Sequence, residues 1–456
     1  MVFHRATIKV EAAIGILASV LSPAGCGGSF ANQPDAAVSD SGTDAITSTG
    51  GTMGNLWVDV DGGSCTRSST LVEYDGAAAC PSLDAAYAAA ELGDTVIVNG
   101  GTYPSQTITE KAGKDGTIIQ PHVVFMPMSG DVVSIHGIDL GTGSGGGGDD
   151  GPDHITLRGF VMPPSSTDGC YIWVRPDSHD IHIEAVDVCS FGITGVDSAP
   201  ATWPSNIVVK DSDFGPCPAD WSTCTNSRVE ASNNLTIDHN VFHDYTRSLD
   251  TQHYECLVIW SAAGTEGLHL SRNRFSHCAV FDVALYHETT TVGITPVLVE
   301  NNFFGHPTDI GTAPAPMGQA AVMFKNVAPF PNTTFRNNSF APGGAVVWNS
   351  VGSNNTWTSS KEVGDLGEPD CQTATVGVTY SYNVETSGTC AGTGNVMVST
   401  LSDLYIDAVA GDFHLAGSPG STVADGRVPA VQCPAIDIDG DPRPTTGFCD
   451  AGADER

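Results

Sequence analysis

The chain has 456 residues and a formal net charge of −34, and 40% of its residues are hydrophobic. Such a negative charge argues against nucleic acids and anionic membrane surfaces as partners, whereas it is compatible with calcium, with cationic sugars or with solubility alone. The hydrophobic content is sufficient for a large core, and the 52 glycines suit a fold that turns often.

Residues 1–25 have the features of an export signal. A basic start is followed by the apolar run Ala12–Leu21, which is too short to span a bilayer. The segment Pro23-Ala24-Gly25-Cys26 resembles the cleavage site of bacterial lipoproteins, and this resemblance implies a lipid anchor on Cys26. The Gly27 that follows, where an aspartate would resemble a retention signal, favours the outer membrane or the cell surface. An ordinary secretory signal is the alternative.

Folded structure is expected to begin near residue 55. Residues 26–54 are rich in Ser, Gly, Asp and Thr, a composition typical of a disordered tether. A short helix is predicted between Ser82, which can cap its start, and Gly93, which can end it. The segment Asp94–Tyr103 follows as the first strong strand and turn.

A four-residue motif, called the phrase below, then occurs seven times along the chain. Each copy mostly alternates apolar and polar residues, so each copy is predicted to be a strand. Self-similarity at a period of 26 to 36 residues, with no helical segment between the copies, is typical of stacked units that bury their apolar sides together. We therefore expect an all-β fold, a single-stranded parallel β-helix. The copies begin at Ile155, Ile181, Ile207, Leu235, Leu268, Val297 and Thr333.

The repeat predicts three columns of side chains along the stack. The first and third residues of each copy should point inward, and the second and fourth outward. The fourth residues alternate in charge, which predicts either a ladder of ion pairs or a face that meets sugar carboxylates. An asparagine column should satisfy backbone groups in a turn, and a phenylalanine column should lie in the core. These columns are Arg158, Glu184, Lys210, Asp238, Ser271, Glu300 and Arg336; Asn240, Asn273, Asn302 and Asn338; and Phe214, Phe242, Phe275, Phe304 and Phe340.

The cysteines support export. There are 13, and setting Cys26 aside leaves an even number in close sequential pairs. Such pairs could staple single loops or neighbouring coils in an oxidising compartment, but the spacing alone does not fix their connectivity. The pairs are 65/80, 170/189, 217/224, 256/278, 371/390 and 433/449.

Both ends of the folded region resemble known families. The short helix followed by Asp94–Tyr103, which ends in Gly-Thr-Tyr, resembles the entry to pectin-lyase-like right-handed parallel β-helix proteins. The segments Asp437–Pro444 and Asp450–Glu455 resemble the C-terminal region of bacterial choice-of-anchor Q proteins. The resemblance covers residues 55–456 and implies a right-handed β-helix with an N-terminal capping helix. Because this scaffold carries lyases, hydrolases, epimerases and adhesins, it implies a fold more than an activity.

The richest group of reactive side chains follows the fourth copy of the phrase. Aligning Glu255–Trp260 with Asp282–His287 would stack Glu255 beside Asp282. Two carboxylates at a coil spacing of about 4.8 Å repel each other unless they share a proton or a cation. A shared proton would suit a glycoside hydrolase, and a shared calcium ion would suit an extracellular site with oxygen ligands.

The candidate site combines these acids with nearby bases. Polysaccharide lyases of similar fold neutralise a uronate with calcium and use Lys or Arg as the base, so the resemblance implies a basic residue here. The alternative is a polar cluster of loops without catalysis. The candidate catalytic residues are Lys210, Asp238, Arg247, His253, Glu255 and Arg272, and the candidate calcium ligands are Asp250, Glu255 and Asp282.

Two functions are compatible with the sequence. The first is a cell-surface lipoprotein that cleaves or binds carbohydrate, as a polysaccharide lyase, a glycoside hydrolase or a binding protein. The second is a non-catalytic adhesion or structural protein of the surface. We expect a monomer whose partner is a polysaccharide or a cell-surface glycan.

Overall fold

The computed structural model describes most of the chain after residue 51. Gly51–Arg456 forms one compact unit. The expected export signal and Cys26 fall outside the described residues, so lipidation stays a prediction. Within the ranges described, no helix is long and apolar enough to cross a membrane. The described residues are 52–142, 151–162, 164, 169–195, 202–217, 226–246, 255–261, 266–287, 295–305, 321–326, 332–342, 344, 346–347, 356–367, 376–386, 388, 390–417 and 421–456.

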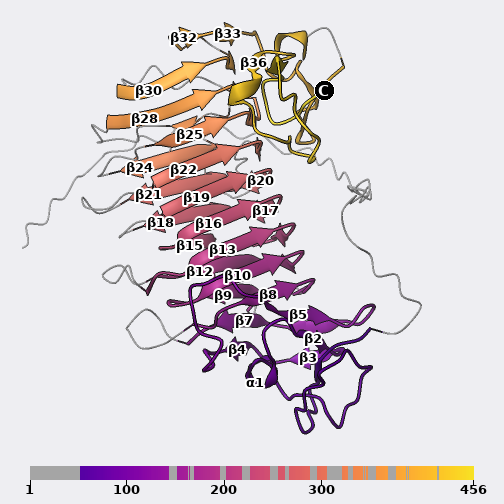
Figure 1. Ribbon diagram of the computed structural model, residues 1–456. Coiled ribbons are helices and arrows are strands. Elements are labelled where there is room, and N and C mark those ends of the chain that lie inside the picture. The colour runs from indigo at the N-terminus through magenta and orange to yellow at the C-terminus, as the bar shows by residue number, and fades with distance from the viewer. Residues whose placement is uncertain are drawn as a thin grey trace, which may run out of the picture. The chain divides into compact units, whose positions relative to one another are not determined.

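Three parallel sheets build this unit as a right-handed parallel β-helix (Figure 1). Each full coil passes through one strand of sheet I, then sheet II, then sheet III, and the crossover has the usual right hand. Among the described residues, sheet I has 13 strands. They are β1 (Leu56–Val58), β2 (Thr95–Val98), β5 (Val123–Pro127), β8 (Ile155–Arg158), β10 (His179–Glu184), β13 (Ser205–Lys210), β16 (Asn233–Asp238), β19 (Glu266–Ser271), β22 (Thr295–Glu300), β25 (Thr333–Arg336), β28 (Thr356–Val363), β30 (Val376–Ser381) and β32 (Gly392–Thr393).

Sheets II and III each have nine strands within the described ranges. Sheet II contains β11 (Asp187–Val188), β14 (Asp213–Phe214), β17 (Val241–Tyr245), β20 (Arg274–Cys278), β23 (Phe303–Phe304), β26 (Ser339–Phe340), β29 (Leu366–Gly367), β31 (Val384–Glu385) and β33 (Val396–Met397). Sheet III contains β4 (Gln106–Ile108), β7 (Gly137–Leu140), β9 (Tyr171–Val174), β12 (Ser190–Ile193), β15 (Ser227–Val229), β18 (Leu257–Ser261), β21 (Val283–His287), β24 (Val322–Asn326) and β27 (Val346–Val347). Shorter pairs join β3 (Gly101–Tyr103) to β6 (Val133–Ile135), β34 (Tyr405–Asp407) to β35 (Asp412–Leu415), and β36 (Val428–Pro429) to β37 (Phe448–Cys449).

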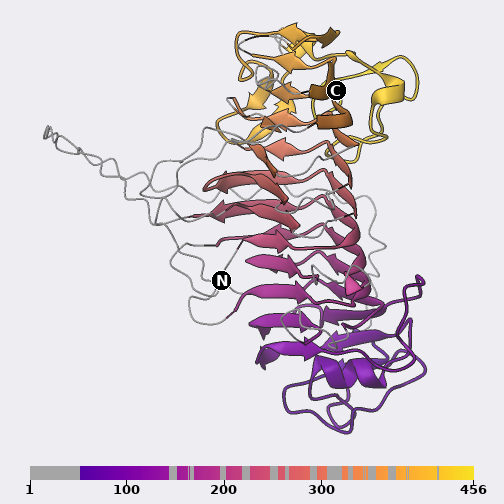
Figure 2. The same cartoon turned by 90° about the vertical axis from the view of Figure 1, so that its left-hand side faces the viewer.

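Helix α1 (Leu83–Ala89) lies at the N-terminal end of the stack, as predicted (Figure 2). The Ser82 hydroxyl caps it by accepting a hydrogen bond from the backbone N–H of Ala85 at 3.1 Å. Leu83 is fully buried against the first coils. The helix ends at Ala89, before the expected stop at Gly93.

The repeat phrase defines sheet I with the expected register. Ile181 pairs with Ile155 on one side and with Ile207 on the other, and this alignment continues through Leu235, Leu268, Val297 and Thr333. These inward residues are at most 1% exposed. The core therefore runs along the inside of the coils, and the prediction of a parallel β-helix is confirmed.

The asparagine and phenylalanine columns are also confirmed. Each Asn amide donates to the side-chain oxygen of the next Asn, at 3.0 Å for all three steps from Asn240 to Asn338. The ladder continues to Asp365, whose Oδ1 accepts from the Asn338 amide at 3.0 Å. The rings from Phe214 to Phe340 are stacked with centroids 4.9 to 5.3 Å apart. Both columns tie successive coils together.

A second turn column was not expected from the sequence. The residue directly before the first inward residue of each early copy has a left-handed backbone, with φ of 54° at His154, 57° at Asp180, 55° at Asn206 and 53° at Asn234. Asn, Asp and His are the non-glycine residues most often found with positive φ. This turn directs the side chains of successive coils into one line at the edge of sheet I.

The charged column of sheet I is confirmed in part. Arg158 donates two hydrogen bonds to Glu184, at 3.0 and 2.7 Å, and Lys210 lies 3.4 Å from the same carboxylate. A hydrogen bond from His182, together with Arg158, lowers the pKa of Glu184 to about 2. Asp238 forms an ion pair with Arg272, which takes the place of the ion pair expected between Lys210 and Asp238.

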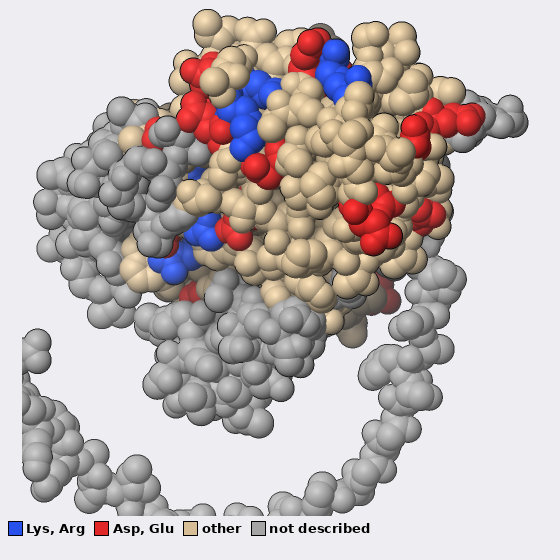
Figure 3. Space-filling view, turned by 90° about the horizontal axis from the view of Figure 1, so that it is seen from below, with Lys and Arg blue, Asp and Glu red and all other residues tan. Residues whose placement is uncertain are grey.

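The charges of the N-terminal end are paired in the same manner. Figure 3 looks at this end of the molecule, where basic side chains lie beside acidic ones. Lys111 is 2.6 Å from Asp84, and Arg67 is 2.5 Å from Asp94. Local pairing of the few cations leaves the remaining acids to set the net charge.

Among the described residues, four of the expected disulfides have both cysteines present. They are Cys65–Cys80, Cys170–Cys189, Cys256–Cys278 and Cys433–Cys449. Cys217 and Cys390 are also disulfide-bonded. Their expected partners, Cys224 and Cys371, lie outside the described residues.

The C-terminal segment that resembled choice-of-anchor Q proteins packs back against turns between sheets I and II, including the turn after β22. The guanidinium of Arg443 is buried, donates to Glu455 at 2.9 Å and donates to Asn301 at 3.1 Å. Asn301 in turn donates to the carbonyl of Ile436 at 2.6 Å. This segment therefore closes one side of the stack.

Candidate functional site

The outer side of sheet III carries aromatic side chains. In β9, Ile172 and Val174 are fully buried in the core, and the alternating residues Tyr171 and Trp173 are half-buried on the outside. Strand pairing places Trp260 and Tyr286 side by side on the same outer side, with ring centroids 6.0 Å apart; Trp260 is half-buried, and Tyr286 is buried beneath it at 7% exposure. We call Tyr171, Trp173, Trp260 and Tyr286 the aromatic strip.

Glycines make room for the first half of the aromatic strip. A Cβ atom at Gly192 would lie 2.4 Å from the Trp173 ring, and one at Gly137 would lie 2.7 Å from the Tyr171 ring. Any other residue at these positions would displace the rings. The two rings therefore lie directly against the backbone of neighbouring strands.

Each tryptophan of the strip is covered by an arginine that is itself paired with an acid. The guanidinium of Arg175 lies 4.9 Å from the centre of the Trp173 ring, and its Nε donates to Asp139 at 3.0 Å. The guanidinium of Arg228 lies 4.8 Å from the centre of the Trp260 ring, and it is 2.8 Å from Glu230. Both units combine an apolar ring, a cation and an anion.

The two units lie three coils apart and are offset along the strands, because Trp173 lines up through Gly192 and Arg228 with Val258, two residues before Trp260. They lie on β9 and β18, which are separated in sheet III by β12 and β15. Three coil steps of about 4.8 Å, combined with an offset of two residues at about 3.3 Å each, put them about 16 Å apart. An elongated ligand that runs along sheet III could contact both.

Glu255 and Asp282 lie at the edge of this face, in a register different from the one expected. Pairing of Leu257 with Val283 places Trp260 beside Tyr286, one residue away from the predicted alignment with His287. Glu255 therefore lines up with Phe281, and the expected Glu255–Asp282 stack was wrong by one residue. The cause is that Leu257–Ile259 and Val283–Leu285 are apolar at every position, so the apolar pattern does not distinguish one register from the next.

The two carboxyl groups have different surroundings. Glu255 is buried and accepts hydrogen bonds from the Tyr286 hydroxyl at 3.0 Å and from the Asn226 amide at 2.9 Å. Asp282 is also buried, and neither of its oxygens has a hydrogen-bond partner among the described residues. Burial raises the pKa of Asp282 well above its usual value, which favours the neutral acid.

The other predicted catalytic residues that the structure describes lie away from Glu255. Lys210 and Asp238 are on sheet I, and Arg272 follows it in the turn toward sheet II, where it is ion-paired with Asp238. Glu255 lies beside sheet III. The predicted single site was therefore wrong for these four residues. Arg247, Asp250 and His253 lie outside the described residues.

Two groups of described side chains could hold a metal ion, and both contain histidine. His414, Asp439 and Asp454 form the first. Both ring nitrogens of His414 face carboxylates, Asp412 and Asp439; although burial lowers its pKa, these contacts raise the pKa to about 9. A protonated imidazole cannot ligate a metal. His122, Asp180 and His182 form the second group.

Calcium, implied by the resemblance, is not matched by the donor sets of the described residues. Calcium takes six to eight oxygen ligands, whereas both metal-capable groups include an imidazole. Glu255 is engaged by Tyr286 and Asn226, and the expected neighbour Asp282 is displaced by one residue. We therefore assign no calcium site to these ranges.

The aromatic strip was missed from sequence, although a signal for it exists. Tyr171-Ile172-Trp173-Val174 alternates aromatic and aliphatic residues, which is typical of a strand with a large apolar side chain on its solvent face. The strands of sheet III lie between turns of variable length. The register between these strands therefore cannot be predicted from the sequence without knowing how the coils stack.

Comparison with known proteins finds similar solved structures of low sequence identity. No protein-family model matches the chain, and no curated protein does. A solved structure of XylC in complex with xylose covers 87% of this chain and 98% of its own, with 10% identity and a TM-score of 0.43. Pectate lyase Pel9A covers 88% and 96%, with 13% identity and a TM-score of 0.43. A variant of AlyGC, an alginate lyase of family PL6, covers 78% and 58%, with 12% identity and a TM-score of 0.33.

Proposed function

We propose that this protein binds a polysaccharide along the outer side of sheet III. The observation that carries the proposal is the pair of arginine-covered tryptophans, Trp173 and Trp260, three coils apart on this side of the sheet. Because arginines cover both tryptophan rings, a sugar would pack its apolar face on the open ring edges and on the alkyl stems of the arginines, and its hydroxyl groups would bond to the charged side chains. A polymer repeats both features, as the strip does.

The charges beside the strip favour neutral sugars. Arg175 and Arg228 are each held by a carboxylate, Asp139 and Glu230. A uronate would have to compete with these carboxylates for the guanidinium groups, in a chain that already has a net charge of −34. Neutral hydroxyl groups can bond to the paired groups without separating them.

The same pairing favours binding over cleavage. Lyase chemistry needs a free base, and the described candidates Lys210 and Arg272 are ion-paired away from the aromatic strip. Hydrolysis needs two carboxyl groups beside the bound sugar. Asp139 and Glu230 lie there, and their ion pairs suit hydrogen bonding to hydroxyls more than proton transfer. We therefore infer a binding protein, and glycoside hydrolysis is an outcome that the test can detect.

Replacing Trp260 with alanine is expected to weaken polysaccharide binding about thirtyfold, because truncating a central tryptophan costs about 2 kcal/mol or more. Calorimetric titration with neutral and uronate polysaccharides, with and without EDTA, measures this loss, and release of reducing ends reports hydrolysis. Phe448→Ala is the matched control, since Phe448 is an exposed ring, 57% accessible, outside the strip. Equal binding by both variants, or binding of uronates alone, would contradict the proposal.

We also infer that the protein is exported and anchored at the outer membrane or cell surface. The export signal supports this, and so do the disulfides, which persist in oxidising compartments. Mass spectrometry of the membrane fraction is expected to find acyl groups on Cys26. A soluble mature chain that begins at another residue would rule the anchor out.

A further inference from the structure

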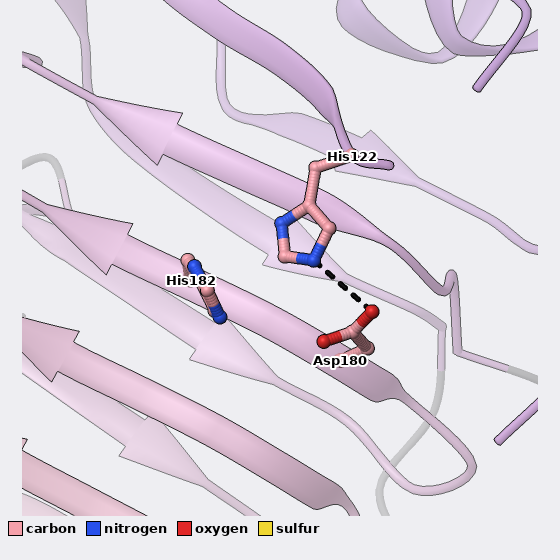
Figure 4. Close-up of side chains that lie close together, drawn as sticks. All are labelled: His122, Asp180 and His182. Atoms are coloured by element: carbon pink, nitrogen blue, oxygen red, sulfur yellow. Dashed lines mark ion pairs between the residues drawn. The ribbon is translucent and has the colours of Figure 1, made fainter. Parts of the chain in front are cut away.

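We propose that His122, Asp180 and His182 bind one divalent transition-metal ion, with zinc as the best match. Their ligand atoms all lie within 4.8 Å of one another. Figure 4 shows His122 and Asp180 directed toward each other, with the ring of His182 beside them. This site is on the outer side of sheet I, so it is independent of the proposed polysaccharide face on sheet III.

The fold brings these residues together from coils that are not adjacent. His122 precedes β5, whereas Asp180 and His182 belong to β10, and β8 lies between these strands in sheet I. The left-handed turn at Asp180 sets the direction of its carboxylate. Strand pairing places His182 next to Thr156 of β8. The Thr156 side chain is small, so the His122 ring can reach across β8 to Asp180 and His182.

Both histidines have one ring nitrogen occupied and one directed at the cluster. The Nδ1 of His122 is 2.7 Å from the Thr156 hydroxyl, and its Nε2 is 3.1 Å from Asp180. The Nδ1 of His182 is 3.3 Å from Glu184, so its Nε2 is the nitrogen left for a ligand bond. Metal-binding histidines typically donate their other N–H to such a partner, which fixes the tautomer and orients the ring.

Asp180 is oriented in the same way. Its Oδ2 accepts from the Nδ1 of His154 at 2.8 Å and from the backbone N–H of Gln120 at 3.3 Å. When His122 donates from Nδ1 to Thr156, its Nε2 lone pair faces this carboxylate at 3.1 Å. Two such electron donors need a proton or a cation between them.

The degree of burial suits a site with an open position. The side chains of His122 and Asp180 are 10% and 3% exposed, and His182 is 32% exposed. Two imidazoles and one carboxylate leave the fourth tetrahedral position of zinc to water on the side of His182. Imidazole donors select zinc and related metals over calcium and magnesium. The bound ion would tie the coil of β5 to that of β10.

The test is competition titration of the full-length protein, free of affinity tags, stripped with EDTA and with free thiols alkylated. The parent is expected to take one equivalent of Zn²⁺ from a chromophoric chelator and to melt at a higher temperature with Zn²⁺, but not with Ca²⁺. Co²⁺ in the same site should give the visible absorption of a low-coordinate complex. His182→Gln should weaken binding more than the ten- to hundredfold typical of losing a supporting partner, and should abolish the Co²⁺ signal.

The control is His269→Gln. His269 occupies the same outward column of sheet I and is 3.0 Å from a glutamate, Glu300, but it is not part of the metal-capable group. This variant is expected to bind Zn²⁺ like the parent. Because His182 is partly exposed, its replacement should leave the fold intact, as the melting curve without metal checks. Equal Zn²⁺ affinity in both variants, or no tight equivalent in the parent, would overturn the proposal.

Discussion

Replacing Asn273 with leucine is expected to lower the free energy of unfolding by several kcal/mol. The Asn273 amide donates to the Ile237 carbonyl at 2.8 Å and to the Asn302 side chain at 3.0 Å. Its oxygen accepts from the backbone N–H of Asn240 at 3.1 Å and from the Asn240 amide at 3.0 Å. Each buried polar group left without a partner costs about 1–3 kcal/mol, and leucine removes the partner of more than one.

Urea denaturation of the parent and the variant measures this loss. The matched control is Asn233→Leu, at the start of β16, where the side-chain oxygen is buried and has no hydrogen-bond partner among the described residues. Removing an unsatisfied oxygen should change stability by about 0.5 kcal/mol or less, or increase it. Similar losses in both variants would show that the asparagine ladder does not stabilise the stack through its hydrogen bonds.

Replacing Asp365 with asparagine is expected to stabilise the protein increasingly as the pH rises from about 4 to about 8. Asp365 continues the asparagine ladder: its Oδ1 accepts from Asn338, but its Oδ2 has no hydrogen-bond partner among the described residues. In the earlier coils, the atom that corresponds to Oδ2 is the amide nitrogen of an asparagine, which donates to a backbone carbonyl. The Asn338 amide, for example, donates to the Val299 carbonyl at 3.0 Å. The carboxyl can replace that donor only when it is protonated.

The direction of the pH effect follows from the proton balance. Burial raises the pKa of Asp365 from 3.8 to about 8. Between these values the unfolded chain has lost the proton and the folded chain holds it, so stability falls as the pH rises through this window and levels off above it. Each unit of pKa shift is worth about 1.4 kcal/mol, and the asparagine variant avoids this loss.

Melting temperatures of the parent and Asp365→Asn across pH 4 to 9 test this prediction through the difference between the two curves, which cancels the titration of the other acids. The reciprocal variant Asn302→Asp is the control, because it places a carboxyl in a ladder position that now holds an amide. It should lose stability relative to the parent as the pH rises. A constant difference between the parent and Asp365→Asn would mean that Asp365 does not titrate in this range.

The fold and the inner columns could be predicted from residue spacing alone. A phrase with inward residues at its first and third positions is buried by any stacking of coils, so its register is fixed by burial alone. The asparagine and phenylalanine columns follow at constant distances from the phrase, within a short turn whose length does not vary. For this reason Asn240–Asn338 and Phe214–Phe340 could be placed from spacing.

The contacts between outer side chains could not be predicted in this way, because they depend on how the coils stack. Turns of different length separate the phrase from the strands of sheet III, so Glu255 and Asp282 could not be aligned correctly, and a shift of one residue reverses the face of a side chain. The aromatic strip depends on that alignment. The metal-capable group depends on stacking, because His122 reaches Asp180 across an intervening coil. The spacing of residues in the sequence predicts which side chains are buried in the core. The contacts between outer side chains depend on how neighbouring coils are stacked.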